Sequence, residues 1–227
     1  MQNIVAANLA TVTARIRAAE RATGRTPNSV HLLAVSKTKP LADIEAAAAA
    51  GQRAFGENYA QEAVTKAIAL AGRNLEWHFI GPVQANKTRD LATHMHWVHT
   101  LERAKIARRL NDQRPDHLAP LNVCLQVNIS GEASKAGLGP SDLSELAHII
   151  AELPKLRLRG LMAIPAPATS EADQRAPFRA LTELFVALQQ QHPAIDTLSM
   201  GMSSDLEAAV TEGATLVRVG TDIFGAR

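Results

Sequence analysis

The sequence has a single cysteine, Cys124, among its 227 residues, which excludes a disulfide within the chain. Cys124 lies in the apolar run 121–129, so we expect a buried and inert thiol, not a catalytic one. No stretch approaches the roughly 20 consecutive apolar residues of a membrane-spanning helix. The N-terminus also lacks the basic start and apolar core of a secretory signal. We therefore expect a cytoplasmic protein that does not interact with a membrane.

Charge of one sign and aromatic residues are also scarce. The formal net charge is +2 and aromatic residues make up 4% of the chain. Lysines and arginines are scattered among acids, so the basic, aromatic-rich surface of a nucleic-acid-binding protein is not expected. Hydrophobic residues make up 46%, which is ordinary for a globular protein with a sizeable core. The length favours one domain over residues 1–227.

Two common catalytic arrangements are not supported by the sequence. No Gly-x-Ser-x-Gly motif of a serine hydrolase is present. The group His94, His96 and His99 resembles a metal site, but in an extended segment His99 faces away from the other two. No carboxylate or cysteine stands at a typical ligand spacing. We expect no bound metal.

Short apolar runs alternate with helical patterns along the chain, after an amphipathic helix predicted over 4–20. The strand candidates are 30–36, 53–56, 77–80, 97–99, 121–129, 158–164, 198–200 and 215–220. The helices between them are predicted over 41–50, 57–71, 84–92, 102–110, 141–153, 175–191 and 205–212. No hairpin turn signal joins two runs, which favours parallel strands with helical crossovers.

Eight such units predict an α/β fold made of one closed (β/α)8 TIM barrel with an extra N-terminal helix. The alternative is an open doubly wound sheet. The number of units and the lack of a Gly-x-Gly-x-x-Gly turn after the first strand argue against it.

Lys37 follows the first strand candidate, at the end of a barrel strand where ligands are bound. Burial and nearby cations would make its amine a nucleophile toward carbonyl groups, as a Schiff base requires. A lysine whose amine reaches solvent explains the position equally well. Lys39 and Lys87 are expected in solvent, whereas Lys135 lies in a glycine-rich loop that either contacts a ligand or moves freely.

Arg218 lies on the last strand candidate, where alternation puts it on the face opposite Val217 and Val219. The valines suit the layer between sheet and helices, so Arg218 is expected to point into the barrel. A buried guanidinium needs partners. These are either a structural ion pair or a polar or aromatic ligand.

A phosphate site is predicted after the last two strands. Ser203 and Ser204 follow Gly201 at a predicted helix start, and Gly220-Thr221 ends the eighth strand. Barrels often bind phosphate between these two loops. Simple N-capping also explains the serines. With Lys37 and Arg218, these residues describe a pocket for pyridoxal phosphate.

At this point the sequence closely resembles the pyridoxal 5′-phosphate homeostasis protein family (YggS/PROSC). The matching segments run through nearly the whole chain and are 34–40, 55–59, 77–81, Gln84 with Asn86-Lys87, 127–129, 160–162, 199–203, 217–221 and 224–225. The resemblance implies a barrel similar to the N-terminal domain of alanine racemase. It also implies Lys37 in a Schiff base with pyridoxal 5′-phosphate and Arg218 against the pyridine nitrogen.

The resemblance further implies Ser203, Gly220 and Thr221 around the phosphate. Asn58 would lie near the cofactor, and Ile80 and Met200 would line its ring.

The function implied is intracellular cofactor homeostasis, in which bound pyridoxal phosphate is buffered or delivered to apo-enzymes that need it, with little catalysis. An arginine leaves the pyridine nitrogen unprotonated, so the ring withdraws electrons less strongly. Alanine racemase uses a tyrosine from a second domain, whereas this sequence has one tyrosine, Tyr59. The alternatives are a weakly active, racemase-like pyridoxal phosphate enzyme and a barrel aldolase using Lys37 alone. Loss of the second domain favours a monomer.

Overall fold

A computed structural model describes residues 2–131 and 136–226, and its strands close into a barrel in the order β1 to β8. The strands are β1 (His31–Val35), β2 (Ala54–Glu57), β3 (Glu76–Phe79), β4 (Trp97–Leu101), β5 (Leu121–Gln126), β6 (Leu156–Met162), β7 (Thr197–Ser199) and β8 (Leu216–Val219). All neighbouring strands are parallel, and β8 pairs with β1. The predicted closed barrel is confirmed, and the open sheet was wrong.

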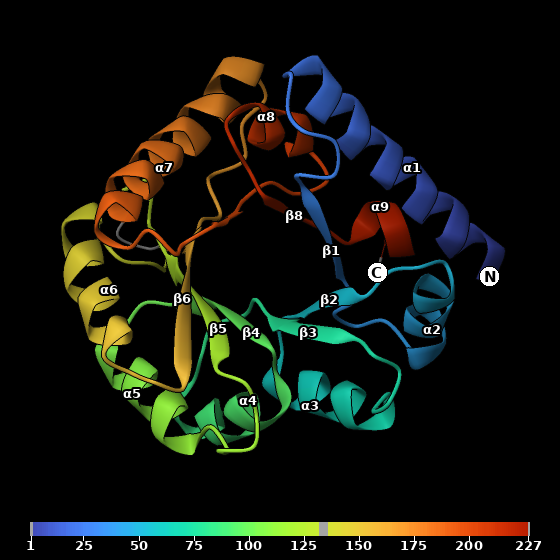
Figure 1. Cartoon of the computed structure of the whole chain (residues 1–227). Coiled ribbons are helices and arrows are strands. Elements are labelled where there is room, and N and C mark those ends of the chain that lie inside the picture. Colours follow the sequence, from blue (N-terminus) through green and yellow to red (C-terminus); the bar gives the residue numbers. More distant parts are fainter. Residues whose placement is uncertain (1, 132–135, 227) are drawn as a thin grey trace.

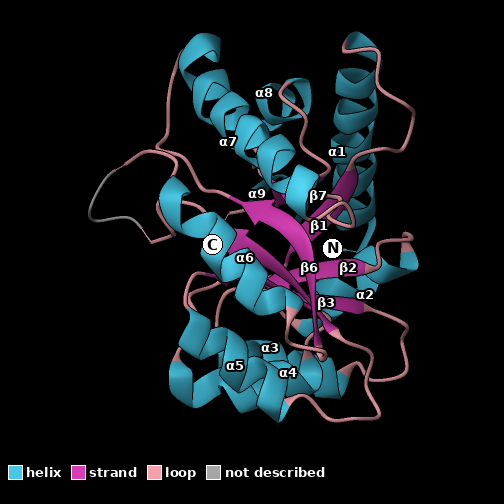
Figure 2. Ribbon diagram, turned by 60° about the vertical axis from the view of Figure 1, so that its left-hand side comes forward, coloured by secondary structure: helices cyan, strands magenta, loops and turns pink. Residues whose placement is uncertain are grey.

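Helices surround the barrel on its outside (Figure 1, Figure 2). They are α1 (Gln2–Ala22), α2 (Leu41–Ala49), α3 (Ala60–Ala69), α4 (Thr88–His94), α5 (Ala104–Gln113), α6 (Leu143–Ala151), α7 (Glu171–Gln191), α8 (Leu206–Thr211) and α9 (Thr221–Phe224), with 3-10 turns η1 (Ala85–Lys87) and η2 (Pro140–Asp142). No helix among the described residues is long and apolar enough to cross a membrane.

Two predicted helices differ from the observed ones, and the difference in the second has a local cause. The helix predicted over 84–92 is divided into η1 and α4. The helix predicted over 175–191 begins at Glu171, because the Ser170 hydroxyl accepts a hydrogen bond from the Asp173 amide at 3.1 Å. Asp173 and Glu171 in the first turn also favour this helix start electrostatically.

Strand alternation divides the buried residues into two layers. Val217 and Val219 belong to the main core, which lies between the sheet and the helices. Leu33, Ile80 and Leu216 form a separate cluster inside the barrel. The predicted orientation of β8 is therefore confirmed, and Arg218 opposite Leu33 in the β1–β8 register lies in the interior.

The N-terminal helix α1 is packed against the barrel's last elements. It lies beside α2 and α9 in Figure 1, and it also contacts α8. Val12 and Ile16 on its inner face are almost completely buried, whereas Ile4 is 62% exposed. The Asn8 amide donates to the Ile223 carbonyl of α9 at 3.0 Å. The helix therefore closes the side of the barrel next to β8.

Truncation of the inner face of α1 should destabilise the whole barrel. Ile16→Ala removes a fully buried side chain, so we expect the free energy of unfolding to fall by about 2–5 kcal/mol. Ile4→Ala on the exposed face should change it by less than about 0.5 kcal/mol. Urea unfolding of both variants measures the difference. Equal effects would show that α1 contributes no specific packing.

Candidate functional site

The carboxyl ends of the strands bring most of the predicted residues to one rim of the barrel. Lys37 follows β1, Asn58 follows β2, Ile80 follows β3, and Gly220 follows β8. Because all strands are parallel, these ends meet at the same side, which is where barrel proteins bind ligands. Lys37 is half-buried there.

The turn that carries Lys37 is held by a buried ion-pair network. Glu57, which is 0% exposed, accepts from the Ser36 hydroxyl and from Lys66 Nζ at 2.9 Å. Lys66 also donates to the Ser36 carbonyl at 2.7 Å and to Glu62 at 2.6 Å. Every donor of the Lys66 ammonium therefore has a partner.

A second contact from the same network fixes the next residue of the turn. The Thr38 amide donates to Glu62 Oε1 at 2.6 Å, and Thr38 has a φ of 64°, which a β-branched residue rarely adopts. Burial raises the pKa of the Glu57 carboxyl, against the lowering effect of its bonds from Ser36 and Lys66. The turn around Lys37 is consequently rigid and preorganised.

Lys39 was expected in solvent, and that prediction was wrong. Its Nζ donates to the carbonyls of Phe224, Gly225 and Ala226 at 3.1, 2.9 and 3.0 Å. These carbonyls lie at and beyond the end of α9, where a cation is favoured. Lys39 therefore fixes the C-terminal segment to the loop after β1.

Arg218 is 4% exposed and its partners are neutral. Its Nη1 donates to the Ser199 carbonyl at 2.6 Å and to the Ser199 hydroxyl at 2.9 Å, and its Nη2 donates to the Ala163 carbonyl at 2.9 Å. Among the described residues it forms no ion pair, so the structural ion pair considered from the sequence was wrong. Burial lowers the pKa of Arg218 to about 10, which leaves it protonated near neutral pH.

The loop after β7 differs from the prediction at its helix start. Asp205, not Ser203 or Ser204, is the N-cap residue of α8, and the Asp205 carboxylate accepts from the Met202 amide at 2.6 Å. The half-buried Ser203 therefore has no capping role, so N-capping does not explain it. Gly201 has a φ of 90°, and a Cβ there would collide with Ala209.

Arg15 of α1 connects the two loops of the predicted phosphate site. It donates to the Ser203 carbonyl at 3.0 Å, to Glu207 at 2.9 and 3.0 Å, and to Asp222 at 2.7 Å. A cation between two carboxylates also reduces their repulsion of an anion. This contact could not be predicted from the sequence, because Arg15 is 188 residues from Ser203 and 207 from Asp222.

The other residues predicted to contact the cofactor differ in their burial. Asn58 is half-buried, and its Oδ1 is buried without a hydrogen-bond partner among the described residues. Gly81 approaches the Asn58 backbone so closely that any Cβ there would collide with it. Thr221 is exposed and Gly220 half-buried. Ile80 is 8% exposed inside the barrel.

Met200 does not support the expected contact with the ring. It is 0% exposed and belongs to the main core with Leu198, on the side of β7 opposite the inward Ser199. A side chain without accessible surface supports the rim from behind and does not line it. Lys135, the loop lysine considered from the sequence, lies outside the described residues.

His94 and His96, which the sequence suggested as metal ligands, have structural partners instead. His96 Nδ1 accepts from the Trp77 amide at 3.0 Å, and His94 Nδ1 contacts the Asp90 carbonyl at 3.0 Å. Burial raises the pKa of the Cys124 thiol to about 12. Within residues 2–131 and 136–226, no group of three or more metal-binding side chains is found.

Comparison with known proteins first defines the class. Residues 7–227 match the family model of the alanine racemase N-terminal domain. The barrel also resembles alanine racemase from Corynebacterium glutamicum, with a TM-score of 0.71 at 15% identity over 99% of this chain and 61% of that one, a likeness of fold alone. The chain is thus a barrel of the alanine racemase N-terminal type.

Full-length relatives then define the family. Pyridoxal phosphate homeostasis protein from Pseudomonas aeruginosa is 60% identical, covering 98% of this chain and 96% of its own. Its counterpart from Escherichia coli is 55% identical, covering 99% and 97%. The structure of PipY from Synechococcus elongatus with pyridoxal phosphate bound has a TM-score of 0.84 at 39% identity, covering 97% and 100%. The chain belongs to the pyridoxal phosphate homeostasis protein family.

Removal of Lys66 should leave an uncompensated carboxylate behind Lys37. Lys66→Met should lower the free energy of unfolding by about 3–5 kcal/mol, because breaking a buried pair strands the remaining charge. Adding Glu57→Gln should restore part of the loss. Lys105→Met, at an exposed lysine of α5, is the control. Urea unfolding measures all three variants.

The loss of unfolding free energy in Lys66→Met should also depend on pH. The pKa of Glu57 in the folded protein is already above its ordinary value, and Lys66→Met raises it further. A raised carboxyl pKa favours the folded state below the ordinary glutamate pKa and disfavours it as pH rises through the folded value. The variant should therefore be less stable at pH 8 than at pH 5, relative to the parent. A loss independent of pH would contradict this account of Glu57.

Proposed function

We propose that this protein binds pyridoxal 5′-phosphate reversibly at the carboxyl end of the barrel and buffers or delivers it inside the cell. The observation that carries the proposal is the placement of Lys37 and Asn58 at one rim, with Arg218 buried below it. The names of the relatives and the pyridoxal phosphate in PipY support it. Lys37 would hold the cofactor as a Schiff base.

The residues present fit such a cofactor. Asn58 Oδ1 is a buried acceptor without a partner among the described residues, so a ligand donor or a bridging water would satisfy it. The three bonds of Arg218 use three of its five N–H donors. Donors of a fixed, charged guanidinium remain for a ring nitrogen. Ile80 supplies an apolar wall beside them.

Backbone and hydroxyl groups after β7 and β8 would bind the phosphate. Ser203, Gly220 and Thr221 are the proposed contacts. A Cβ on Gly220 would come within 3.1 Å of the Val35 carbonyl, so only glycine lets these strand ends approach without displacement. Arg15 would hold the two loops at a fixed separation. Lys39 would keep the segment after α9 in place.

The same residues argue against efficient catalysis. Bound pyridoxal phosphate supplies an electron sink for substrate carbanions. Arg218, with a pKa of about 10, stays protonated at neutral pH, so it would donate a hydrogen bond to the ring nitrogen without transferring a proton. The only tyrosine of the sequence, Tyr59, is 52% exposed. We therefore propose a carrier, not a racemase.

Four further expectations stay predictions. They are a single domain over residues 1–227, a cytoplasmic location, a monomeric state, and transfer of the cofactor to apo-enzymes that depend on pyridoxal phosphate.

Lys37 is tested by trapping the cofactor. Protein incubated with pyridoxal phosphate should turn yellow, and borohydride followed by peptide mass spectrometry should find the modification on Lys37. Lys37→Ala should abolish the Schiff-base absorption band, because it removes the amine that would form the bond. Lys105→Ala should keep it. Modification of another lysine in the parent would overturn the assignment.

Delivery is tested with an apo-enzyme. The loaded protein should activate an apo-enzyme that depends on pyridoxal phosphate, and Lys37→Ala carrying no cofactor should not. A parallel reaction contains a phosphatase that destroys free pyridoxal phosphate. Activation that survives the phosphatase shows direct transfer, and activation that is lost shows buffering. Turnover of amino acids by stoichiometric loaded protein would instead indicate an enzyme.

A further inference from the structure

Two histidines lie in contact inside the barrel, and the proposed function does not use them. His78 of β3 is 1% exposed and His99 of β4 is 0% exposed. His78 Nδ1 lies 2.9 Å from His99 Nε2, and His99 Nδ1 lies 2.8 Å from the Ser199 hydroxyl. The same hydroxyl accepts from Arg218. A continuous series of polar contacts thus begins at Arg218 and crosses the barrel.

The direction of the hydrogen bonds in this series follows from Arg218, which can only donate, and from the need of each buried donor for an acceptor. The Ser199 oxygen accepts from Arg218, and among the described residues the buried Ser199 proton has only His99 Nδ1 as an acceptor, so Ser199 donates to His99. His99 must then carry its proton on Nε2 and donate to His78 Nδ1. His78 in turn must carry its proton on Nε2. Both rings are neutral in this arrangement, and both have the same tautomer.

The series ends at a carboxylate on the opposite end of the barrel. His78 Nε2 lies 3.3 Å from Glu76 Oε2 without forming a hydrogen bond, and Glu76 Oε1 accepts from Trp97 Nε1 at 2.7 Å. Contact with His78, against burial, lowers the pKa of Glu76 to about 2. A proton on His78 Nε2 therefore points to a permanent negative charge.

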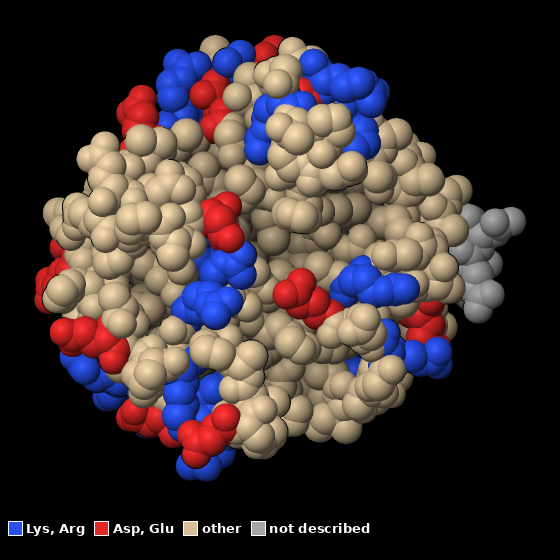
Figure 3. Space-filling model, viewed as in Figure 1, with Lys and Arg blue, Asp and Glu red and all other residues tan. Residues whose placement is uncertain are grey.

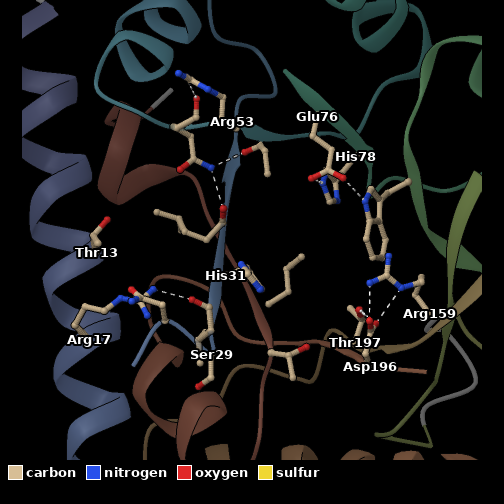
Figure 4. A pocket seen from close by; sticks show the side chains of 18 residues that line it. Thr13, Arg17, Ser29, His31, Arg53, Glu76, His78, Arg159, Asp196 and Thr197 are labelled. Atoms are coloured by element: carbon tan, nitrogen blue, oxygen red, sulfur yellow. Dashed lines mark hydrogen bonds and ion pairs between the residues drawn. The ribbon is translucent and has the colours of Figure 1, made fainter. Parts of the chain in front are cut away.

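A cavity opens beside this end, away from Lys37. It measures about 760 Å³, and its lining includes Glu76, His78, Arg159 and Asp196. Figure 4 shows Glu76 and His78 together on one wall, with the Arg159–Asp196 pair near them. The molecular surface in the view of Figure 3 is hollowed near its centre, with acidic and basic side chains around the hollow. Water can thus reach Glu76, whose side chain is 47% exposed.

The charged groups around the two rings favour the neutral state. His78 faces Glu76, His96 and Arg159, and His99 faces His78 and Arg218. Burial lowers the pKa of both histidines, that of His99 well below its ordinary value. Only Glu76 would favour a protonated His78. The neutral pair keeps a second positive charge away from Arg218.

We propose that Ser199, His99 and His78 form a hydrogen-bonded chain of fixed direction, which the charge of Glu76 orients at its far end and which positions Arg218. The consequence for the cofactor rests on the proposed function, in which Arg218 donates to the ring nitrogen. The chain itself does not, since it is formed without a ligand. Ser199, His99, His78 and Glu76 are positioning residues and touch no cofactor atom.

The chain is tested first on the protein without cofactor. Nitrogen-15 spectra of the histidine side chains report which ring nitrogen carries the proton. We expect protons on Nε2 of both His78 and His99, with acceptor Nδ1 atoms. A proton on Nδ1 of either ring near neutral pH would overturn the proposal, whether or not the protein binds pyridoxal phosphate.

The near end is tested by Ser199→Ala, with Cys124→Ala as the matched control. Both variants remove one buried heavy atom from the barrel strands, but Cys124 is not a member of the hydrogen-bonded chain. Ser199→Ala should change the His99 nitrogen resonances, shift the absorption of bound pyridoxal phosphate, and weaken its binding about tenfold. Cys124→Ala should leave all three near the parent values. Equal effects of the two variants would overturn the proposal.

The far end is tested by Glu76→Gln, which keeps the shape of the side chain and removes its charge. We expect shifts in the nitrogen resonances of both His78 and His99 and in the absorption of the bound cofactor. Asp196→Asn removes a charge from the same cavity without touching the chain and should leave His99 unchanged. Unchanged His99 resonances in Glu76→Gln would overturn the proposed coupling between Glu76 and His99.

If the parent binds no cofactor at Lys37 while both histidines have the expected tautomers, the proposed function fails and the hydrogen-bonded chain is still supported.

Discussion

Arg218 carries a positive charge at 4% exposure, and such a charge is stable in a protein interior only where hydrogen-bond acceptors replace its water. The barrel supplies two carbonyls and one hydroxyl, all neutral, from β7 and the end of β6. A carboxylate in contact would have satisfied the guanidinium more strongly. It would also have competed with any ligand for its donors. Neutral acceptors hold Arg218 in place and leave its charge to act on the site.

The turn that carries Lys37 contains a buried negative charge instead of a positive one. Glu57 is a buried acid, and here the partner is a full charge, Lys66, with a hydroxyl added from Ser36. Lys66 binds the carbonyl of Ser36, the residue before Lys37, so the network fixes the backbone at the point from which the Lys37 side chain departs. The buried charge of Arg218 therefore keeps hydrogen-bond donors available for a ligand. The buried charge of Glu57 is neutralised by Lys66, and the pair supports a rigid turn.

Strand periodicity was enough to predict the barrel, the position of Lys37 after β1 and the inward direction of Arg218. The same alternation, applied to β7, explains why Met200 was misplaced: if Ser199 faces inward to Arg218, Met200 must face the helices. The contacts of Lys66, His99 and Arg15 could not be predicted. Those of His99 and Arg15 join elements distant in sequence, and those of Lys66 bring a helix residue onto the turn after β1. All three depend on strand register and helix rotation, which one sequence does not specify.

The two ends of the barrel have different roles but share its interior. In many barrels the side chains between the ends are apolar and serve packing alone. Here Leu33, Ile80 and Leu216 form one apolar cluster of the interior and Trp97, Cys124 and Met162 another, and polar side chains of β3, β4, β7 and β8 lie inside the barrel with them. Because Arg218, Ser199, His99 and His78 are in successive contact, the orientation of each group restricts its neighbour's. A change at Glu76 therefore has a direct physical route to Arg218, which a wholly apolar interior would not provide.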